Sequence, residues 1–275
     1  MIYLLGGTYE FDKTILIEEA NSGSADKRNT IMAYPGEDVV WDFSAMAVAG
    51  SNRGVVLDGS YWYFKGFEIK GAGDNGMLLS GDNNIIEMMV FNDNQDTGLQ
   101  ISRYQSAYNT IAEWPSNNLI LNCTSKNNCD NATMENADGF AAKLTCGEGN
   151  VFDGCMAYNN SDDGWDLFAK TDTGPIGVVT LRNCIAFRNG YTETGEGYGD
   201  CDGNGVRRTF ALGEHVLHAH RLQHGTHGAA GDDTRTAHWY GKIQKTWIID
   251  IKVWHGKLYL YDACQVDEIH FCLEW

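Results

Sequence analysis

Short runs of alternating apolar and polar residues recur along the chain up to about residue 200, separated by Asn, Asp and Gly. The pattern Gly, apolar, any residue, apolar marks four of them. Its glycines are Gly76, Gly98, Gly139 and Gly164, at intervals of 22, 41 and 25 residues. A period of two indicates strands with two different faces, and the polar residues between them favour turns. The long interval predicts an insertion around residues 104–116.

A second set of residues repeats in the same register. Three cysteines each precede an asparagine by five residues: Cys123, Cys155 and Cys184 precede Asn128, Asn160 and Asn189. Repeats of this length that contain only strands and polar turns are typical of a solenoid with one coil per repeat. Leucine-rich and ankyrin solenoids need helical halves, whose periodicity is absent from this sequence. We therefore predict an all-β protein, a right-handed parallel β-helix.

The composition changes near residue 206. The last asparagine is Asn204, and all eight histidines lie between His215 and His270. Arg208 stands where alternation requires an inward apolar residue, and a buried charge is costly. We therefore expect a β-helix domain over residues 1–206 that is disrupted afterwards. We expect residues 207–275 to form a His-rich tail that does not match the repeat. We attribute this tail to a shifted reading frame or an unrelated fused end.

The first residues of the chain enter in the middle of a repeat, without the basic and apolar regions of a signal peptide. This predicts an internal fragment of a longer solenoid. The formal net charge of −17 argues against nucleic-acid binding, which requires a basic surface. No apolar stretch reaches the roughly 18 residues of a membrane-spanning helix, so we expect no membrane association. An acidic protein that acts on an acidic polymer needs a cationic bridge, and a divalent metal supplies one.

The chain has eight cysteines but no Cys-x2-Cys pair, which argues against a structural zinc site. Cys123, Cys155 and Cys184 recur in one register on the inward side of the predicted strands. A thiol in such a position behaves as a small apolar side chain. We therefore predict a buried column of free thiols.

Four aspartates on neighbouring coils are the candidate chemical groups. Asp138 and Asp163 each precede a marker glycine, so we expect them to stack about 4.8 Å apart. Asp162 adjoins Asp163, and Asp166 faces outward from its strand. A single Asp at a turn usually bonds the local backbone, but carboxylates this close repel one another unless a cation joins them. The number of hard oxygen ligands favours Ca²⁺.

The chain resembles the pectate lyases of polysaccharide lyase family 9 over about residues 2–206. The segments that carry the resemblance are AYPGE (33–37), GDNG (73–76), DTGLQISR (96–103), WPSNNLILNC (114–123), NADGFAAKL (136–144), NNSDDGWDL (159–167) and TGPIG (173–177). The resemblance implies a secreted parallel β-helix that cleaves polygalacturonate by Ca²⁺-dependent β-elimination. It also assigns the primary calcium to Asp138, Asp162, Asp163 and Asp166.

The base of the reaction is where the sequence departs from the family. The family motif resembles Gly-Asn-Gly-Phe-Lys-Leu, with the lysine as base, whereas the matching segment here is GNGVRR (203–208). Arg207 therefore takes the slot of the base. A guanidinium stays protonated in ordinary proteins, although other pectate lyase families are thought to use arginine in this role. Lys143 is a second candidate, and its simpler interpretation is a solvated lysine stem that covers the neighbouring coil.

Three functions follow from these residues. The first is a calcium-dependent pectate lyase, active or inactivated by loss of the base lysine. The second is a non-catalytic β-helix that binds pectate through calcium. The third is a polygalacturonase-like glycoside hydrolase that uses Asp138, Asp162 and Asp163, but inverting hydrolases hold two carboxyl groups about 6.5–9.5 Å apart, and a tighter cluster suits a metal. We expect a monomer whose partner is polygalacturonate.

Overall fold

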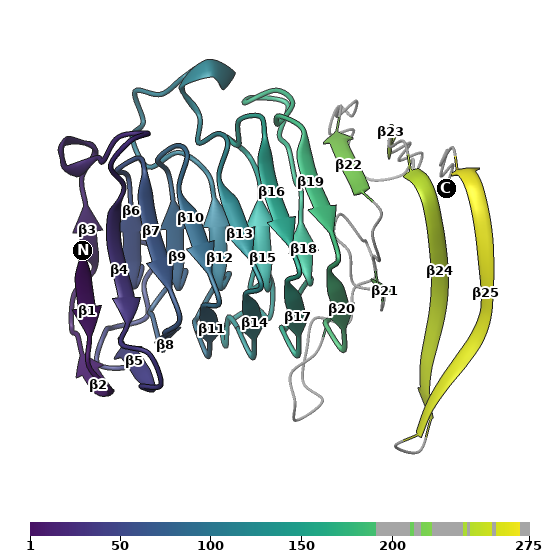
Figure 1. Cartoon of the computed structure of the whole chain (residues 1–275), viewed down its shortest axis with the longest axis horizontal. Coiled ribbons are helices and arrows are strands. Elements are labelled where there is room, and N and C mark those ends of the chain that lie inside the picture. Colours follow the sequence, from purple (N-terminus) through teal and green to yellow (C-terminus); the bar gives the residue numbers. More distant parts are fainter. Residues whose placement is uncertain (191–209, 212–215, 222–238, 241–242, 255–256, 270–275) are drawn as a thin grey trace.

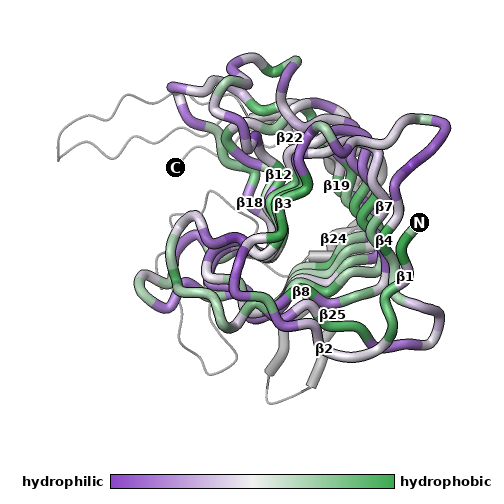
Figure 2. Tube along the Cα trace, turned by 90° about the vertical axis from the view of Figure 1, so that its left-hand side faces the viewer, coloured by the Kyte–Doolittle hydropathy of each residue, from purple (hydrophilic) through white to green (hydrophobic). Residues whose placement is uncertain are grey.

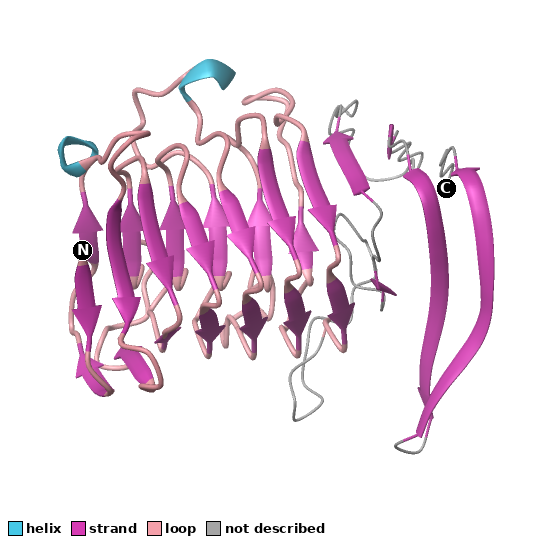
Figure 3. Cartoon of the chain, viewed as in Figure 1, coloured by secondary structure: helices cyan, strands magenta, loops and turns pink. Residues whose placement is uncertain are grey.

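The structure is a computed structural model that describes residues 1–190 in full and the backbone of 210–211, 216–221, 239–240, 243–254 and 257–269. Short strands stack along one axis into three sheets (Figure 1). Loops join the strands, and the helical segments are the short 3-10 turns η1 (Glu19–Asn21) and η2 (Ile111–Glu113) (Figure 3). None of the helices in these described segments is long and apolar enough to span a membrane.

Each coil contributes one strand to each sheet. In spatial order, the first sheet contains β1 (Ile2–Leu4), β4 (Asn29–Ala33), β7 (Trp62–Lys65), β10 (Ile85–Glu87), β13 (Leu119–Leu121), β16 (Asn150–Asp153), β19 (Val179–Arg182), β22 (Val216–Arg221) and β23 (Trp239–Tyr240). The second sheet contains β2 (Gly7–Glu10), β5 (Val39–Asp42), β8 (Glu68–Lys70), β11 (Val90–Asn92), β14 (Thr124–Lys126), β17 (Met156–Tyr158), β20 (Ile185–Phe187) and β21 (Phe210–Ala211).

The third sheet positions the candidate site. It contains β3 (Ile15–Ile17), β6 (Val55–Leu57), β9 (Met77–Leu79), β12 (Leu99–Ile101), β15 (Phe140–Ala142) and β18 (Trp165–Asp166), and all its strands pair in parallel. The first two sheets are also parallel from β1 to β19 and from β2 to β20. The alternating pattern therefore builds a parallel β-helix, as predicted.

The parallel pairing ends where the sequence pattern weakens. Strand β22 pairs antiparallel with β19, and β21 pairs antiparallel with β20. The last strands, β24 (Ile243–Trp254) and β25 (Lys257–Ile269), form an antiparallel pair. This confirms that the regular coil is disrupted before the end of the chain. The predicted boundary at residue 206 and Arg208 lie outside the described residues, so the division into 1–206 and 207–275 stays a prediction.

Apolar residues recur along the stacked strands (Figure 2), and their side chains form a buried core inside the coil. Alternate side chains of the strands point inward, and parallel pairing stacks these side chains in columns. In the third sheet one inward column is Met77, Leu99, Phe140 and Trp165, all fully buried. The rings of Phe140 and Trp165 stack with centroids 5.0 Å apart. This column fixes the register of the residues that precede each strand.

The polar and sulfur-containing residues of the repeat form ladders at the turns. The side chain of Asn128 donates from Nδ2 to Oδ1 of Asn160 at 2.8 Å, and Asn160 repeats this bond to Asn189. The cysteines of the second register, Cys123, Cys155 and Cys184, are buried and free. The predicted column of buried thiols is confirmed.

The insertion in the long interval folds back over earlier coils. The side chain of Gln105 donates to Oδ2 of Asp58 at 2.9 Å, just after β6. The Tyr108 hydroxyl donates to Oε2 of Glu19 at 3.1 Å, in η1 after β3. The insertion thus lies at the carboxyl ends of the third-sheet strands. The amino ends of the same strands carry the aspartates.

Candidate functional site

Two turns at the amino ends of β15 and β18 carry the predicted aspartates. Phe140 pairs with Trp165 in register, so Asp138 and Asp163, each two residues earlier, occupy equivalent positions on adjacent coils. The backbone amide of Asp163 donates to Oδ1 of Asp138 at 3.2 Å, and the amide of Gly139 donates to the carbonyl of Asp163 at 2.8 Å. These bonds hold the two turns against each other.

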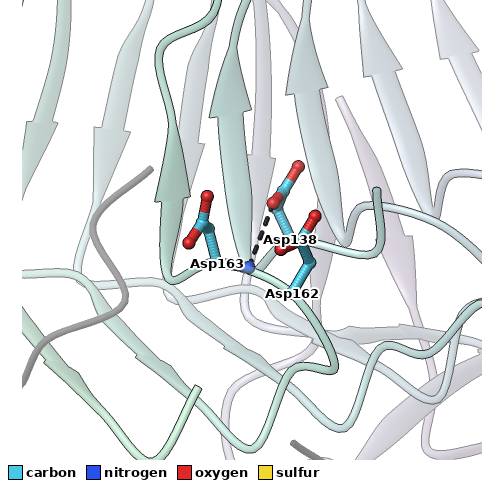
Figure 4. A group of neighbouring side chains, drawn as sticks. All are labelled: Asp138, Asp162 and Asp163. Carbon is cyan, nitrogen blue, oxygen red and sulfur yellow. Dashed lines mark hydrogen bonds between the residues drawn. The ribbon is translucent and has the colours of Figure 1, made fainter. Parts of the chain in front are cut away.

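The structure brings three of the four predicted aspartates together. Asp138, Asp162 and Asp163 each place a carboxylate oxygen within 4.8 Å of the others (Figure 4). Asp138 and Asp163 are 1% and 4% exposed. Oδ2 of Asp162 accepts a hydrogen bond from the amide of Asn136 at 2.9 Å, which fixes this carboxylate as well. Three clustered, oriented carboxylates form an acceptor set suited to a hard divalent cation.

Asp166 is separated from this group by an ammonium. Nζ of Lys143 lies 2.9 Å from Oδ2 of Asp138 and 3.1 Å from Oδ2 of Asp166. The other oxygen of Asp166, Oδ1, is buried and accepts no hydrogen bond from the described residues. A buried carboxylate oxygen without a donor is costly, and a cation beside it would remove that cost. The predicted ligand set therefore fits a calcium ion in chemistry, with Lys143 between two of its members.

The interpretation of Lys143 as a solvated stem is wrong. Its side chain is 9% exposed, because it bends over the turn toward Asp138 and does not run along the surface. Burial lowers the pKa of the Lys143 ammonium, but the carboxylates of Asp138 and then Asp166 raise it well above its ordinary value. Alternation identified the position of Lys143 but not its partners, which depend on the register between two coils.

The pKa of Asp138 also reflects the crowding of charge. Burial raises this pKa well above its ordinary value, the Lys143 ammonium opposes the shift, and the three neighbouring aspartates add to it. Carboxylates that repel one another in a buried place favour protonation or cation binding.

Thr97 is a site residue that sequence reasoning missed. It is fully buried one coil before Asp138, and its Oγ1 lies 3.1 Å from Oδ2 of Asp138 and 2.9 Å from the carbonyl of Asn136. Thr97 precedes Gly98 as Asp138 precedes Gly139. The repeat register contained this signal, but a threonine does not identify itself as a neighbour of a metal ligand.

The outward column of the third sheet is only partly exposed. Leu78, Gln100, Ala141 and Asp166 align on adjacent strands, as the alternation predicts. Leu78 and Ala141 are nevertheless buried, whereas Gln100 and Asp166 are partly exposed. Strands lie about 4.8 Å apart, so long side chains on neighbouring coils shield a short residue such as Ala141 between them. Arg207, the predicted base slot, lies outside the described residues.

Comparison with known proteins identifies the family. The model of the Pel9A-like right-handed β-helix region matches residues 1–224, and the chain belongs to this family. Pectate lyase L of Paenibacillus polymyxa is 52% identical over 206 residues, which cover 75% of this chain and 46% of that protein. Pectate disaccharide-lyase of Dickeya chrysanthemi is 33% identical and is matched over 70% of this chain and 28% of its own length.

Solved structures agree with the sequence relatives. The crystal structure of pectate lyase Pel9A superposes with a TM-score of 0.61 at 32% identity, covering 77% of this chain and 50% of that one. A rhamnogalacturonan lyase superposes with a TM-score of 0.60 at 26% identity, covering 85% of this chain and 56% of that one. The chain spans about half or less of the relatives named here in sequence, and their names are those of polysaccharide lyases. The resemblance to family 9 and the right-handed coil are confirmed.

Proposed function

We propose that this chain carries the calcium site of a pectate lyase that cleaves polygalacturonate by β-elimination. The observation that supports the proposal most directly is the convergence of Asp138, Asp162 and Asp163 at the amino ends of two adjacent third-sheet strands. Asp166, whose Oδ1 is buried without a donor among the described residues, completes the proposed ligand set. A relative named as a pectate lyase matches 75% of this chain.

The chemistry of pectate cleavage suits such a site. Bound calcium would supply Lewis-acid polarisation of a uronate carboxylate, which makes the C5 proton beside it more acidic. A base then removes this proton, its electron pair forms the C4–C5 double bond, and the C4–O bond breaks while the leaving oxygen takes up a proton. The four aspartates would hold the ion, and the ion would bind the uronate carboxylate. The tight cluster also argues against hydrolysis, whose carboxyl pairs are spaced more widely.

The proposed base slot is Arg207, with Lys143 as the second candidate. The ammonium of Lys143 is bound by Asp138 and Asp166, and their carboxylates favour its protonated form. A general base must be deprotonated near the working pH, so these contacts make Lys143 the weaker of the two. The arginine in the slot also supports a second candidate function, in which the chain binds pectate through calcium without cleaving it.

The experiment that distinguishes these functions incubates the protein with polygalacturonate, with and without EGTA. It measures ultraviolet absorbance and reducing ends. We expect calcium-dependent ultraviolet absorbance from unsaturated products, with reducing ends appearing in proportion. Asp162→Asn should abolish both signals, because it removes one carboxylate of the proposed calcium site. Asp162 is partly exposed, so the amide should leave the fold intact. Asp172→Asn, at an exposed position, is the matched control and should leave both signals unchanged. Reducing ends without absorbance would instead indicate hydrolysis.

An Arg207→Lys variant separates cleavage from binding alone. If the slot is that of the base, a lysine should raise the elimination rate by on the order of 100-fold, the scale of general-base catalysis. Calcium-dependent binding with no elimination in either protein would support the pectate-binding function. We further propose that the chain acts outside the cell, where polygalacturonate lies. We also propose that it is a monomer, and size-exclusion chromatography would check this.

A further inference from the structure

One column of residues links the carboxylate cluster to an arginine at the other end of the third sheet. Each third-sheet strand from β6 to β18 is preceded by a glycine, and the residues just before these glycines are Arg53, Asn75, Thr97, Asp138 and Asp163. The strands that follow are in register, from Val55 through Met77, Leu99 and Phe140 to Trp165. Arg53 therefore lies on the same edge as Asp138, three coils away. At about 4.8 Å per coil this separation is roughly 14 Å.

The guanidinium of Arg53 is held through one nitrogen and is open at the others. Its Nε lies 3.3 Å from Oδ2 of Asp74 and 3.4 Å from Oδ1 of Asn75. Neither Nη group donates a hydrogen bond to a described residue, and the side chain is 26% exposed. Asp74 is 5% exposed and so forms a fixed support. The two Nη groups form the fork that binds a carboxylate in a bidentate manner.

Several neutral polar side chains lie in the interval between Arg53 and the aspartates. Nδ2 of Asn75 donates to Oε1 of Gln100 at 3.2 Å, and Nε2 of Gln100 donates to Oγ of Ser102 at 3.0 Å. Gln100 belongs to the outward column of the third sheet and is partly exposed. Such a row offers hydrogen-bond partners to sugar hydroxyls. The partly exposed Asp96 also lies in this interval, where its charge acts on Asp74 and on Lys143.

Because the chain is strongly negative overall, a cation on this edge of the third sheet is a candidate binding group for a polyanion. A chain of formal charge −17 repels a polyanion, so cations must mark the path of the polymer. Lys143, beside the aspartates, already pairs with Asp138 and Asp166. Lys13, which stands two residues before Ile15 as Arg53 stands two residues before Val55, is exposed one coil further from the aspartates. The Nη groups of Arg53, in contrast, donate no hydrogen bond to a described residue.

We propose that Arg53 binds a carboxylate of the polyuronate chain at a subsite three coils from the aspartate cluster. The inference rests on the proposed function, because it takes the polymer to run along this edge from the calcium site. A pyranose ring and a coil of the β-helix are similar in length, so the two contacts would be separated by on the order of three sugar units. The subsite would select long, unesterified uronate chains, since a methyl ester removes the anion that a guanidinium fork recognises.

The test is calorimetric binding of oligogalacturonates of increasing length to the full chain in calcium. We expect Arg53→Gln to weaken binding of pentamers and longer oligomers by on the order of tenfold, the scale of one charge-assisted bidentate contact. Binding of dimers should not change, because they do not reach from the aspartates to Arg53. Arg53→Lys should retain part of the gain with length, since it keeps the charge and loses the fork.

Two further variants of the chain control for loss of the fold. Arg53→Gln alone leaves the buried Asp74 without its cation, so the double variant Arg53→Gln with Asp74→Asn removes the pair together. Arg182→Gln is the matched control, because Arg182 pairs with Asp153 in the first sheet and its side chain is 46% exposed. The double variant should show the same loss with length as Arg53→Gln, and the control should show none.

The outcomes separate this inference from the proposed function. If the unaltered chain binds no oligogalacturonate of any length in calcium, the proposed function fails and the Arg53 subsite fails with it. If the unaltered chain binds long oligomers more tightly than dimers but folded Arg53 variants do the same, only the subsite is refuted. An equal loss for dimers and pentamers, or for esterified and unesterified chains, would also refute it by showing a purely structural role.

Discussion

Two acidic clusters occupy equivalent places at the amino ends of third-sheet strands, and each contains one cation. In the first, Arg53 lies beside Asp74, and burial and then the charge of the neighbouring Asp96 raise the pKa of Asp74. In the second, Lys143 lies between Asp138 and Asp166. The Nη groups of Arg53 have no hydrogen-bond partner among the described residues, and its side chain is 26% exposed, whereas the Lys143 ammonium is enclosed by carboxylates. Corresponding turns of the repeat thus hold a partly exposed cation in one cluster and an enclosed cation in the other.

The difference arises from which of two adjacent positions carries the acid. In the second cluster the residue just before the glycine is Asp138 or Asp163, and it is buried against the next coil. In the first cluster this position holds Arg53 or Asn75, and the acid Asp74 stands one residue earlier. Moving the carboxylate by one position in a turn therefore changes the partner it meets, because register fixes each position against its equivalent on the next coil.

Removing the enclosed cation should have the largest effect. In Lys143→Met, Asp138 remains buried without its ammonium, and the free energy of unfolding without calcium should fall by about 3 kcal/mol, the scale for breaking a buried pair. Added calcium should then raise the melting temperature more than it does in the unaltered protein, because no ammonium competes for Asp138. Thermal denaturation with calcium and with EGTA measures both effects.

Lys170→Met is the matched control for this variant, because Lys170 is exposed. It should leave stability and the calcium response unchanged. Equal stability of Lys143→Met and the unaltered protein in EGTA would contradict the assignment of Lys143 as the counter-ion of the cluster.

The sequence sufficed to predict the coil, its register and the convergence of three aspartates. These features depend on a period that repeats along the chain. The contacts of Lys143 and Thr97 were not predictable, because they join specific atoms on different coils. Arg53 was missed for another reason. Gly54-Val55-Val56-Leu57 fits the marker pattern as well as Gly76-Met77-Leu78-Leu79 does, and adding it extends the column by one coil to Arg53.

The first cluster should give stability a distinct pH dependence. Burial, and then the neighbouring Asp96, raise the pKa of Asp74 from 3.8 to about 6. Between these values the folded protein binds a proton that the unfolded chain does not, so this contribution to stability is complete below pH 3.8 and is lost as pH rises through about 6. The loss should be at most about 3 kcal/mol.

Asp74→Asn removes the titrating group, so its unfolding free energy should lack this decline. Urea denaturation at a series of pH values in EGTA measures the difference between the two proteins. Asp172→Asn, at an exposed site, should keep the decline of the unaltered protein. Parallel pH profiles for Asp74→Asn and the unaltered protein would show that the Asp74 carboxyl is not the source.

The smallest expected effect tests how Asp138 is oriented. Thr97→Val keeps the shape of the fully buried side chain but removes the hydroxyl that lies 3.1 Å from Oδ2 of Asp138 and 2.9 Å from the carbonyl of Asn136. The loss of this contact should lower the free energy of unfolding by about 1 kcal/mol. Calcium affinity should fall by roughly fivefold, in proportion to that energy, because Asp138 becomes free to turn within the cluster.

Thr171→Val, at an exposed position, is the control and should change neither quantity. A Thr97→Val protein that is less stable but binds calcium with unchanged affinity would limit Thr97 to packing and leave the orientation of Asp138 to Lys143 and the amide of Asp163.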